Sequence, residues 1–141
     1  MSIEEANKAS VRRLREEAFN EGNLAIIDEL IPDNHVFHGG EGHELIGPEP
    51  VKKLVTSLRT LFSEFHVTID DMIADGNKVA HQFTFTGTHT GEFEGIAPTG
   101  NKVKMRAAVF NRFENGKVVE TWEYEDRLAL SQQLGIIPPS Q

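Results

Sequence analysis

Residues 102–126 read KVKMRAAVFNRFENGKVVETWEYED, and this stretch decides the fold. Asn115-Gly116 at its centre is the strongest short signal for a β-hairpin, because both residues accept the positive φ angles of a tight turn. Counting outward pairs Phe113 with Val118, Val109 with Trp122, Ala107 with Tyr124, Met105 with Asp126 and, on the other face, Arg106 with Glu125. The face of Met105, Val109, Phe113 and Trp122 is expected to be buried, with Glu120 and Asp126 as its two charged members.

A second hairpin is predicted over residues 65–89, where apolar and polar residues alternate with a period of two. Asp75-Gly76-Asn77 forms its turn. A three-residue loop places Ile69 opposite Phe83, Val67 opposite Phe85 and Asp71 opposite His81. A two-residue loop would mix the apolar and polar faces, so we prefer the first register.

The first half of the chain is predicted to be helical. Ser2 and Glu5 have the spacing of a capping box, and a helical apolar stripe continues from there to Gly22. A short helix over residues 24–31 ends before Pro32, and a third helix begins at Pro48. The glycines of residues 34–47 argue against a regular element over most of that segment.

Helices followed by antiparallel strands indicate an α+β fold, in which a curved antiparallel sheet wraps around the N-terminal helices. The whole chain, residues 1–141, is expected to form one such domain. A curved sheet with one covered face encloses a cone-shaped cavity, which is a natural pocket for a ligand.

The 141 residues carry a net charge of −8 and include no Cys. The negative charge disfavours nucleic acids and membrane surfaces as partners, because both are anionic. The lack of Cys excludes a disulfide framework and a thiolate nucleophile. The N-terminus has no secretory signal pattern and no apolar run is long enough to span a bilayer, so we expect a cytoplasmic protein.

Asp126 is the best candidate for a catalytic residue. The predicted register places its carboxyl group at the end of a strand, on the apolar face, beside Tyr124 and Trp122. Burial there would raise its pKa toward the range that suits general acid–base catalysis. The alternative is that Asp126 only caps the short helix that follows it, a role that Asp performs well.

Other residues are candidates for substrate binding. A buried neutral imidazole at His81 can hold a substrate carbonyl or titrate near neutral pH, and Asp71 is its possible cross-strand partner; the alternative is a satisfied core residue. Tyr124 can donate to a developing enolate or serve as an ordinary core aromatic residue. Trp122 and Met105 are expected to line the cavity, and His38 to point into its mouth.

No metal or cofactor site is predicted. His35, His38 and His43 have the spacing H-x2-H-x4-H, which matches no standard metal motif. The sequence has no nucleotide-binding loop and no G-x-S-x-G motif. The remaining functions are proton transfer in an apolar cavity and binding without chemistry.

Several stretches carry a resemblance to a known family. They are GTHTGEFEGIAPTGNKV (residues 87–103), FENGKVVETWEYED (113–126), QQLG (132–135) and GPEPVKKLVTSLRTLF (47–62). Together they resemble the SnoaL-like polyketide cyclases, also called the ester cyclase family, of the NTF2-like superfamily. The similarity covers nearly the whole chain, and its motifs are specific in combination.

The resemblance implies a cone-shaped α+β barrel, often a homodimer, that uses no metal or organic cofactor. Characterised cyclases of this family catalyse an intramolecular aldol condensation that closes the last ring of an aromatic polyketide ester. An Asp is their general acid–base, and the W-x-x-x-D match implies that Asp126 has this role here. The T-H-x-G match makes His89 similar to the family as well, at the rim of the cavity.

The sequence is therefore compatible with two functions. The first is an enzyme that moves a proton at a carbon next to a carbonyl group. The second is a module that binds a small hydrophobic molecule or a partner protein without chemistry. An enzyme should place a second polar group beside the acid, whereas a carrier needs none. A homodimer is expected through the outward sheet face of Gln82, Thr84, Thr86, Ala108, Phe110 and Thr121.

Overall fold

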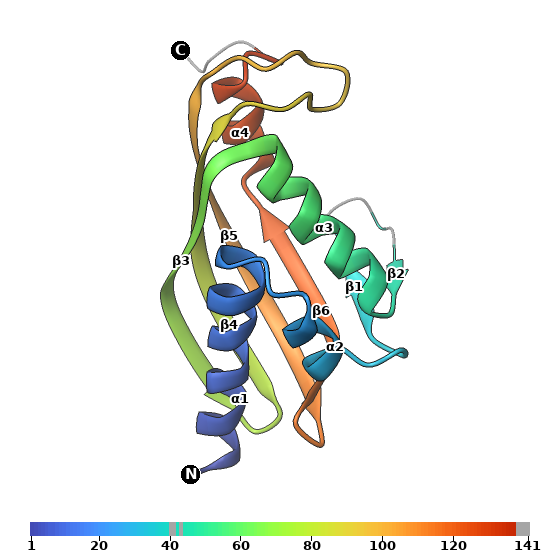
Figure 1. Ribbon diagram of the computed structural model, residues 1–141. Helices are drawn as coiled ribbons and strands as arrows, with labels where there is room; N and C mark the ends of the chain where they lie inside the picture. Colours follow the sequence, from blue (N-terminus) through green and yellow to red (C-terminus); the bar gives the residue numbers. More distant parts are fainter. Residues whose placement is uncertain (40–41, 43, 138–141) are drawn as a thin grey trace.

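The structure, a computed structural model, describes residues 1–39, 42 and 44–137. Four helical elements, of which α1 and η1 are continuous, precede the long strands, and a short helix follows them (Figure 1). In chain order the elements are α1 Ile3–Arg13, the π-helix η1 Leu14–Asn20, α2 Ala25–Leu30, β1 Val36–His38, β2 Glu44–Ile46, α3 Pro48–Leu61, β3 Phe62–Asp75, β4 Lys78–His89, β5 Lys102–Glu114, β6 Lys117–Glu125 and α4 Arg127–Gln133.

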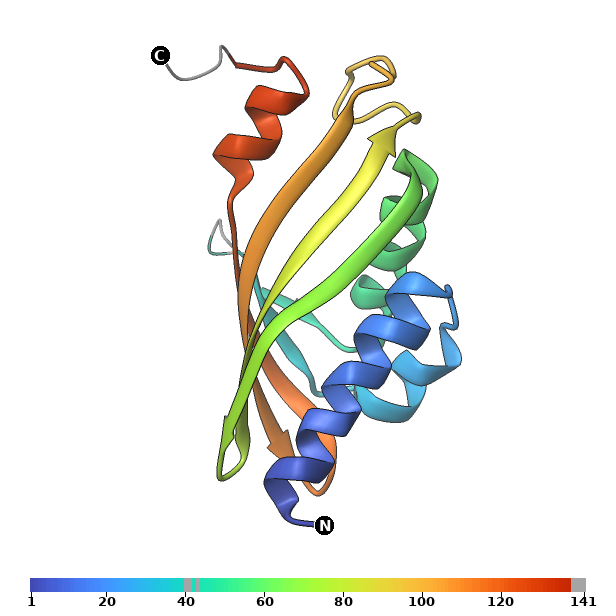
Figure 2. The same cartoon turned by 90° about the vertical axis from the view of Figure 1, so that its left-hand side faces the viewer.

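A single six-stranded sheet has the strand order β2-β1-β6-β5-β4-β3. It is strongly twisted and curved, and α1, α2 and α3 cover one of its faces, which we call the inner face (Figure 2). The predicted α+β class is confirmed. The sheet is mixed rather than antiparallel throughout, because β1 and β6 pair in parallel. Within the described residues it is also open, because its edge strands β2 and β3 do not pair with each other.

The short strands β1 and β2 lie within residues 34–47, where the glycines argued against regular structure. β1 pairs with β6, so that Val36 lies beside Glu120 and His38 beside Trp122. A partner that is distant in the sequence supplies these backbone hydrogen bonds. Local composition cannot predict strands of this kind.

The helix signals at Ser2 and Pro48 are confirmed. The Ser2 hydroxyl oxygen accepts a hydrogen bond from the Glu5 N–H at 3.1 Å, and Pro48 is the first residue of α3. The first helix continues from α1 into η1 and ends at Asn20. The Asn20 side chain bonds to both backbone groups of Val67 on β3, at 2.9 and 2.7 Å. These bonds attach the end of the first helix to the edge of the sheet.

The β3–β4 hairpin has the predicted register over its central part. Ile69 lies opposite Phe83 and Val67 opposite Phe85, as the alternation indicated. The predicted three-residue loop is wrong, because Asp75 pairs with Lys78 and only Gly76 and Asn77 form the turn. Between this turn and a bulge at Asp70 the pairing differs by one residue, so that Met72 lies opposite His81. The predicted pairing of Asp71 with His81 is therefore wrong, because a bulge inserts one residue into one strand only.

The β5–β6 hairpin contains a second bulge. Phe113 pairs with Val118 as predicted, but Arg112 pairs with Glu120, so that Val119 is the additional residue. Beyond it the pairs are Phe110 with Trp122, Ala108 with Tyr124, Val109 with Glu123 and Ala107 with Glu125. The predicted pairings of Val109, Ala107, Met105 and Arg106 with residues of the second strand are wrong for this reason.

The shift at Val119 exchanges the two faces of β6, because successive side chains of a strand point to opposite faces. Thr121 and Glu123 are buried with Val109, whereas Trp122 and Tyr124 lie on the outer face with Phe110. Val118 and Val119 are both buried. The prediction that Trp122, Tyr124 and Asp126 share a face with Met105 and Val109 is therefore wrong.

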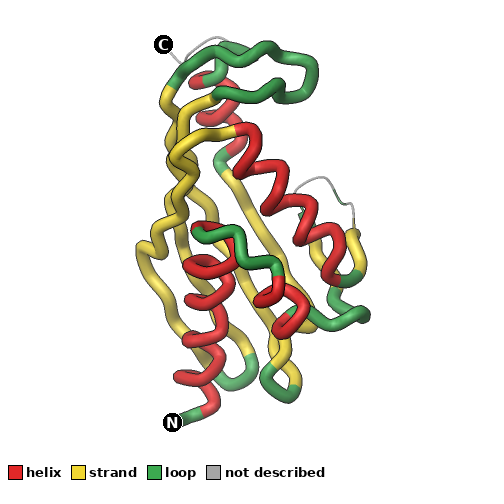
Figure 3. Tube along the Cα trace, viewed as in Figure 1, coloured by secondary structure: helices red, strands yellow, loops and turns green. Residues whose placement is uncertain are grey.

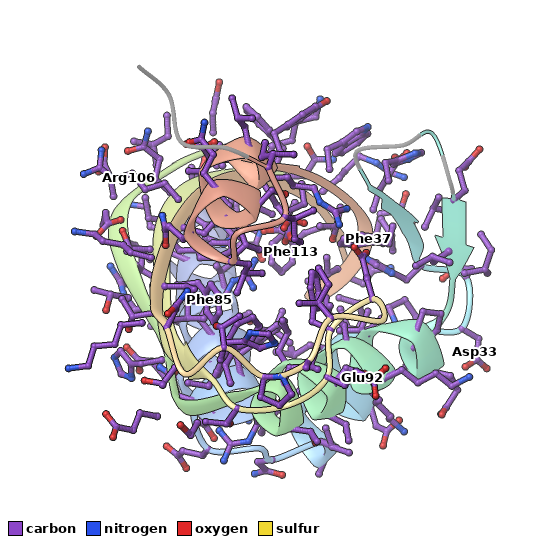
Figure 4. All side chains as sticks on the ribbon, turned by 90° about the horizontal axis from the view of Figure 1, so that it is seen from above. Asp33, Phe37, Phe85, Glu92, Arg106 and Phe113 are labelled. Carbon is purple, nitrogen blue, oxygen red and sulfur yellow. The ribbon has the colours of Figure 1, made fainter. Side chains whose placement is uncertain are left out.

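The core lies between the helices and the inner face of the sheet. Viewed along the sheet from above, Phe85 points into the enclosed space and Arg106 points away from it (Figure 4). The expected burial of Met105, Val109 and Phe113 is confirmed. None of the helices in the described part of the chain is both long and apolar enough to cross a membrane.

Candidate functional site

A cavity of about 170 Å³ lies on the inner face of the sheet, lined by side chains of η1, α3, β3, β4, β5, β6 and α4. Residues 90–101, the green loop at the upper end in Figure 3, contribute Phe93 to its wall. Six phenylalanines line the cavity: Phe19, Phe62, Phe65, Phe83, Phe85 and Phe93. Its polar lining consists of four charged residues, Arg15, Glu123, Glu125 and Arg127.

Arg15 is a buried cation at the inner end of this cavity. Its Nε donates a hydrogen bond to His81 Nε2 at 3.2 Å, and its Nη2 donates to Glu123 Oε1 at 3.4 Å. The guanidinium carbon lies 4.6 Å from the ring centre of Phe19 and 4.3 Å from that of Phe83. The charge is thus paired, and the aromatic faces stabilise it further.

His81 is a neutral acceptor in this arrangement. Because Nε2 accepts from Arg15, the ring proton lies on Nδ1. Burial, together with the positive charge of Arg15, lowers the pKa of His81 to about 2. His81 lies inside as predicted, but it does not titrate near neutral pH.

Glu123 and Glu125 form a carboxyl pair on β6. They are two residues apart and therefore face the same side of the strand. Burial, the neighbouring Glu123 carboxylate and a hydrogen bond between the two carboxyl groups raise the pKa of Glu125 to about 7. Glu123 is buried, whereas Glu125 is open to solvent on one side and lies at the mouth of the cavity. Glu125 can therefore exchange a proton near neutral pH.

A smaller chamber of about 40 Å³ lies on the other side of Arg15. Thr121 Oγ1 lies 2.9 Å from His35 Nε2 and accepts from Asn111 Nδ2 at 3.0 Å. Burial lowers the pKa of His35 to about 4, so this imidazole is also neutral. The Nδ1 atoms of His35 and His81 and the Oδ1 atom of Asn111 are buried without a partner among the described residues. This chamber adjoins the larger cavity, because Arg15 and Glu123 line both.

Asp126 lies outside the cavity. It follows the last residue of β6 and is the N-cap of α4, where its carboxylate accepts a hydrogen bond from the Ala129 N–H at 3.1 Å. Its side chain is exposed and lines a groove on the outer face of the sheet, together with Arg106 and Tyr124. The predicted position of Asp126 among buried aromatic rings is wrong, and the helix-cap alternative describes its contacts.

Replacing Asp126 by Ala is expected to reduce the free energy of unfolding by about 0.5–2 kcal/mol, because the α4 N-terminus loses its cap. Asp126→Asn is expected to change it little, because Asn caps a helix nearly as well as Asp. Urea denaturation of the three proteins measures both changes. Equal losses in the two variants would contradict the capping role.

Three other candidates lie on the outer face. The His38 ring stacks on Trp122 at 5.3 Å, and His38 Nε2 lies 2.7 Å from Glu120 Oε2. Tyr124 is 59% exposed and makes an edge-to-face contact with Phe110. None of the three lines the inner cavity. The predicted positions of His38 at the mouth and of Trp122 and Tyr124 in the wall are wrong, because these strand positions face outward.

Met105 and His89 lie on the inner side. Met105 contributes to the cavity wall. His89 is fully buried, contacts Phe62 at 5.9 Å between ring centres, and accepts a hydrogen bond at Nδ1 from the Thr99 N–H at 3.2 Å. His89 thus attaches residues 90–101 to the end of β4, at the rim of the cavity.

The predicted site did not include Arg15, Glu123 or Glu125. Arg15 lies four residues after Val11 and four before Phe19, so helical spacing alone places it on the apolar face. For the two glutamates the only local signal is the pair of adjacent valines at 118 and 119, because regular alternation would expose one of them.

The residues that the structure describes contain no cluster of three or more His, Asp or Glu side chains that could hold a metal ion. His35 lies inside the protein and His38 on the outer face. His43 lies outside the described residues.

Comparison with known proteins identifies similar chains. Residues 9–134 match the family of SnoaL-like polyketide cyclases. Aklanonic acid methyl ester cyclase DnrD of Streptomyces peucetius is 30% identical over 128 residues, which cover 89% of this chain and 88% of DnrD.

Solved structures have the same fold. A candidate SnoaL-like polyketide cyclase from Jannaschia sp. CCS1 superposes with a TM-score of 0.87 at 23% identity, over 98% of this chain and 97% of its own. AclR of Streptomyces galilaeus, a candidate hydroxylase, superposes with a TM-score of 0.85 at 30% identity, over 96% of this chain and 84% of its own.

Proposed function

The chain belongs to the SnoaL-like polyketide cyclase family and has its NTF2-like α+β fold. From this we propose that it is an enzyme that uses general acid–base catalysis. The reaction is an intramolecular aldol cyclisation, or the related enolisation, of a small hydrophobic carbonyl compound. One observation carries this proposal: Glu125, with a pKa raised to about 7, lines the same apolar cavity as Arg15.

In this proposal Glu125 is the general base. Its carboxylate takes a proton from the carbon next to a carbonyl group; the C–H electron pair becomes the C=C bond of an enolate, and the π pair of the C=O bond moves to the oxygen. The resulting enolate attacks a second carbonyl of the same molecule, and Glu125 returns its proton to the new alkoxide. The sequence of steps is redox-neutral, so it requires no electron-transfer cofactor.

Arg15 stabilises the negative charge that develops on the substrate oxygen. Its Nε and one Nη2 hydrogen are directed at His81 and Glu123, and no group among the described residues accepts from Nη1. The Nη1 hydrogens are thus available to an enolate oxygen in the cavity, where solvent competes little. Glu123 and His81 hold the guanidinium in place.

This proposal moves the acid–base role from Asp126 to Glu125. The cavity also contains the second polar group that distinguishes an enzyme from a carrier, because Arg15 and Glu125 both line it. A carrier of hydrophobic molecules would gain nothing from a buried ion pair in its wall, because burying charges is costly.

Proton exchange tests the proposed function. Acetophenone is a simple ketone with exchangeable hydrogens next to its carbonyl group. The protein in D2O is expected to accelerate the replacement of these hydrogens by deuterium above the buffer rate, as followed by NMR. A rate equal to that of buffer, under conditions in which acetophenone is shown to bind, would contradict the proposal.

A homodimer through the outer face of the sheet is part of the proposal. Phe110 is 46% exposed there, packs edge to face with Tyr124, and has Ala108 and the polar Gln82 and Thr84 around it on the same face. An apolar patch within a polar surface is typical of an association site. Thr121, earlier placed on this face, is buried on the inner side instead.

Light scattering at tens of micromolar is expected to give the mass of a dimer. Phe110→Glu should weaken association by about 30-fold or more, because it places a charge at the centre of the contact. Ile3→Glu is the matched control, because Ile3 is an exposed apolar residue at the N-terminus of α1. A monomeric wild-type protein would contradict the proposed dimer.

A further inference from the structure

The cavity is small for a ligand pocket. Its volume of about 170 Å³ is close to that of an engineered cavity of about 150 Å³ that holds benzene. Pockets for drug-sized ligands are roughly 300–1,000 Å³. We infer that, if the proposed function holds, the substrate is a neutral, single-ring carbonyl compound of about six to nine non-hydrogen atoms.

The aromatic walls of the cavity are held in place by their own contacts. Phe62 and Phe85 are packed edge to face with ring centres 4.9 Å apart, and Phe65 lies 5.1 Å from Phe85. Gly87 on β4 lies so close to Phe62 that an added Cβ would come within 2.8 Å of the Phe62 Cβ. The β3–β4 wall is thus close-packed behind the phenylalanines and cannot widen without moving the backbone.

The loop of residues 90–101 limits the cavity at its mouth. The Thr90 and Gly91 N–H groups both donate to Leu61 O at 3.0 Å, and Gly100 N–H donates to His89 O at 2.9 Å. Between these attachments, Phe93 and Ile96 exchange backbone hydrogen bonds of 2.9 and 2.8 Å. The Phe93 ring therefore reaches the cavity from a loop that is bonded at both ends and in its middle.

The charges of the cavity indicate a neutral ligand. Arg15 is paired with Glu123 at 3.4 Å, and Arg127 with Glu94 at 3.6 Å. Each arginine that lines the cavity thus has its own carboxylate partner. Glu125 would repel a carboxylate ligand whenever it is ionised. An aromatic or otherwise unsaturated ring fits walls that already pack ring edges against ring faces.

Calorimetric titration with ketones of one and two rings tests this inference. Acetophenone is expected to bind to the wild-type protein at least ten-fold more tightly than 2-acetylnaphthalene. Benzoate, a single-ring anion, is expected to bind at least ten-fold more weakly than acetophenone at pH 8. Equal or tighter binding of 2-acetylnaphthalene or of benzoate, or no binding of acetophenone at 5 mM, would overturn the inference.

Phe93→Ala provides the sharper test, because it removes one wall and leaves Arg15, Glu123 and Glu125 in place. It should raise the affinity for 2-acetylnaphthalene at least ten-fold relative to that for acetophenone. Ile96→Ala is the matched control, because Ile96 lies in the same turn but does not line the cavity. An equal gain in both variants would overturn the size limit.

Binding and proton exchange separate the two proposals. If acetophenone binds selectively but its hydrogens exchange at the buffer rate, the size limit holds and the proposed catalysis fails. If 2-acetylnaphthalene binds more tightly and its methyl hydrogens exchange faster than those of acetophenone, the catalysis holds and the size limit fails.

Discussion

Glu125→Gln is expected to lower the catalysed rate of proton exchange by about 10²–10⁴-fold, because the amide cannot accept the substrate proton. The change keeps the size and polarity of the side chain, and it leaves the pair of Arg15 and Glu123 intact. NMR measurement of deuterium incorporation into acetophenone gives the rate for each protein. The affinity for acetophenone, measured by calorimetry, is expected to change little.

The matched control for this variant is its neighbour. Asp126→Asn replaces an acid with its amide one residue further along the chain, outside the cavity, and is expected to retain full exchange activity. The opposite result, with Asp126→Asn inactive and Glu125→Gln active, would return the acid–base role to Asp126.

The pH dependence of the exchange rate is a second test of the role of Glu125. A base must be ionised to act, so the wild-type rate is expected to rise about ten-fold per pH unit below about pH 7 and to level off above it. Glu125→Gln should lose this inflection. A wild-type rate that falls as pH increases through 7 would contradict the role of Glu125 as the base.

Arg15→Met is expected to reduce the free energy of unfolding by about 3–5 kcal/mol. Met preserves much of the side-chain volume, but the buried Glu123 carboxylate loses its ion pair and His81 loses its hydrogen-bond donor. An isolated buried charge is costly, whereas a buried pair is close to neutral in energy. Urea denaturation measures the loss.

The double variant Arg15→Met with Glu123→Gln completes the test. Removing both charges should recover a large part of the lost stability, so the two changes should be strongly non-additive. Arg112→Met is a suitable comparison, because Arg112 bonds to Glu114 and Glu120 at the surface. Its loss should be below about 1 kcal/mol. A similarly small loss of stability in Arg15→Met would show that leaving the Glu123 carboxylate without its ion pair costs little free energy, which would contradict this prediction.

The parts of the fold that depend on local chemistry could be predicted from the sequence. Asn115 and Gly116 both have positive φ angles in the turn. The predicted pairs are correct where no bulge intervenes, namely Phe113 with Val118, Ile69 with Phe83 and Val67 with Phe85. The same holds for Ser2 and Pro48, because helix caps act over a few residues.

The candidate site could not be predicted in the same way, because it depends on one residue that breaks the alternation. An error of one position at Val119 moved Glu123 to the wrong face and brought Trp122 and Tyr124 inside. Asp126 was then assigned surroundings that belong to Glu123 and Glu125. Arg15 was missed for a different reason, since a charged residue on an apolar helix face is buried only when a distant partner such as Glu123 neutralises it.

The bulge at Val119 also bears on how such a protein changes over evolutionary time. Loss of this single residue would preserve the turn, the adjacent Val118 and the composition of the strand. It would also preserve every pair beyond the bulge, so that Glu123 would still lie opposite Val109 and Glu125 opposite Ala107. The bulge is thus the position at which β6 can lose one residue without changing which of its later side chains face the cavity, so a difference in strand length between relatives need not alter the pocket.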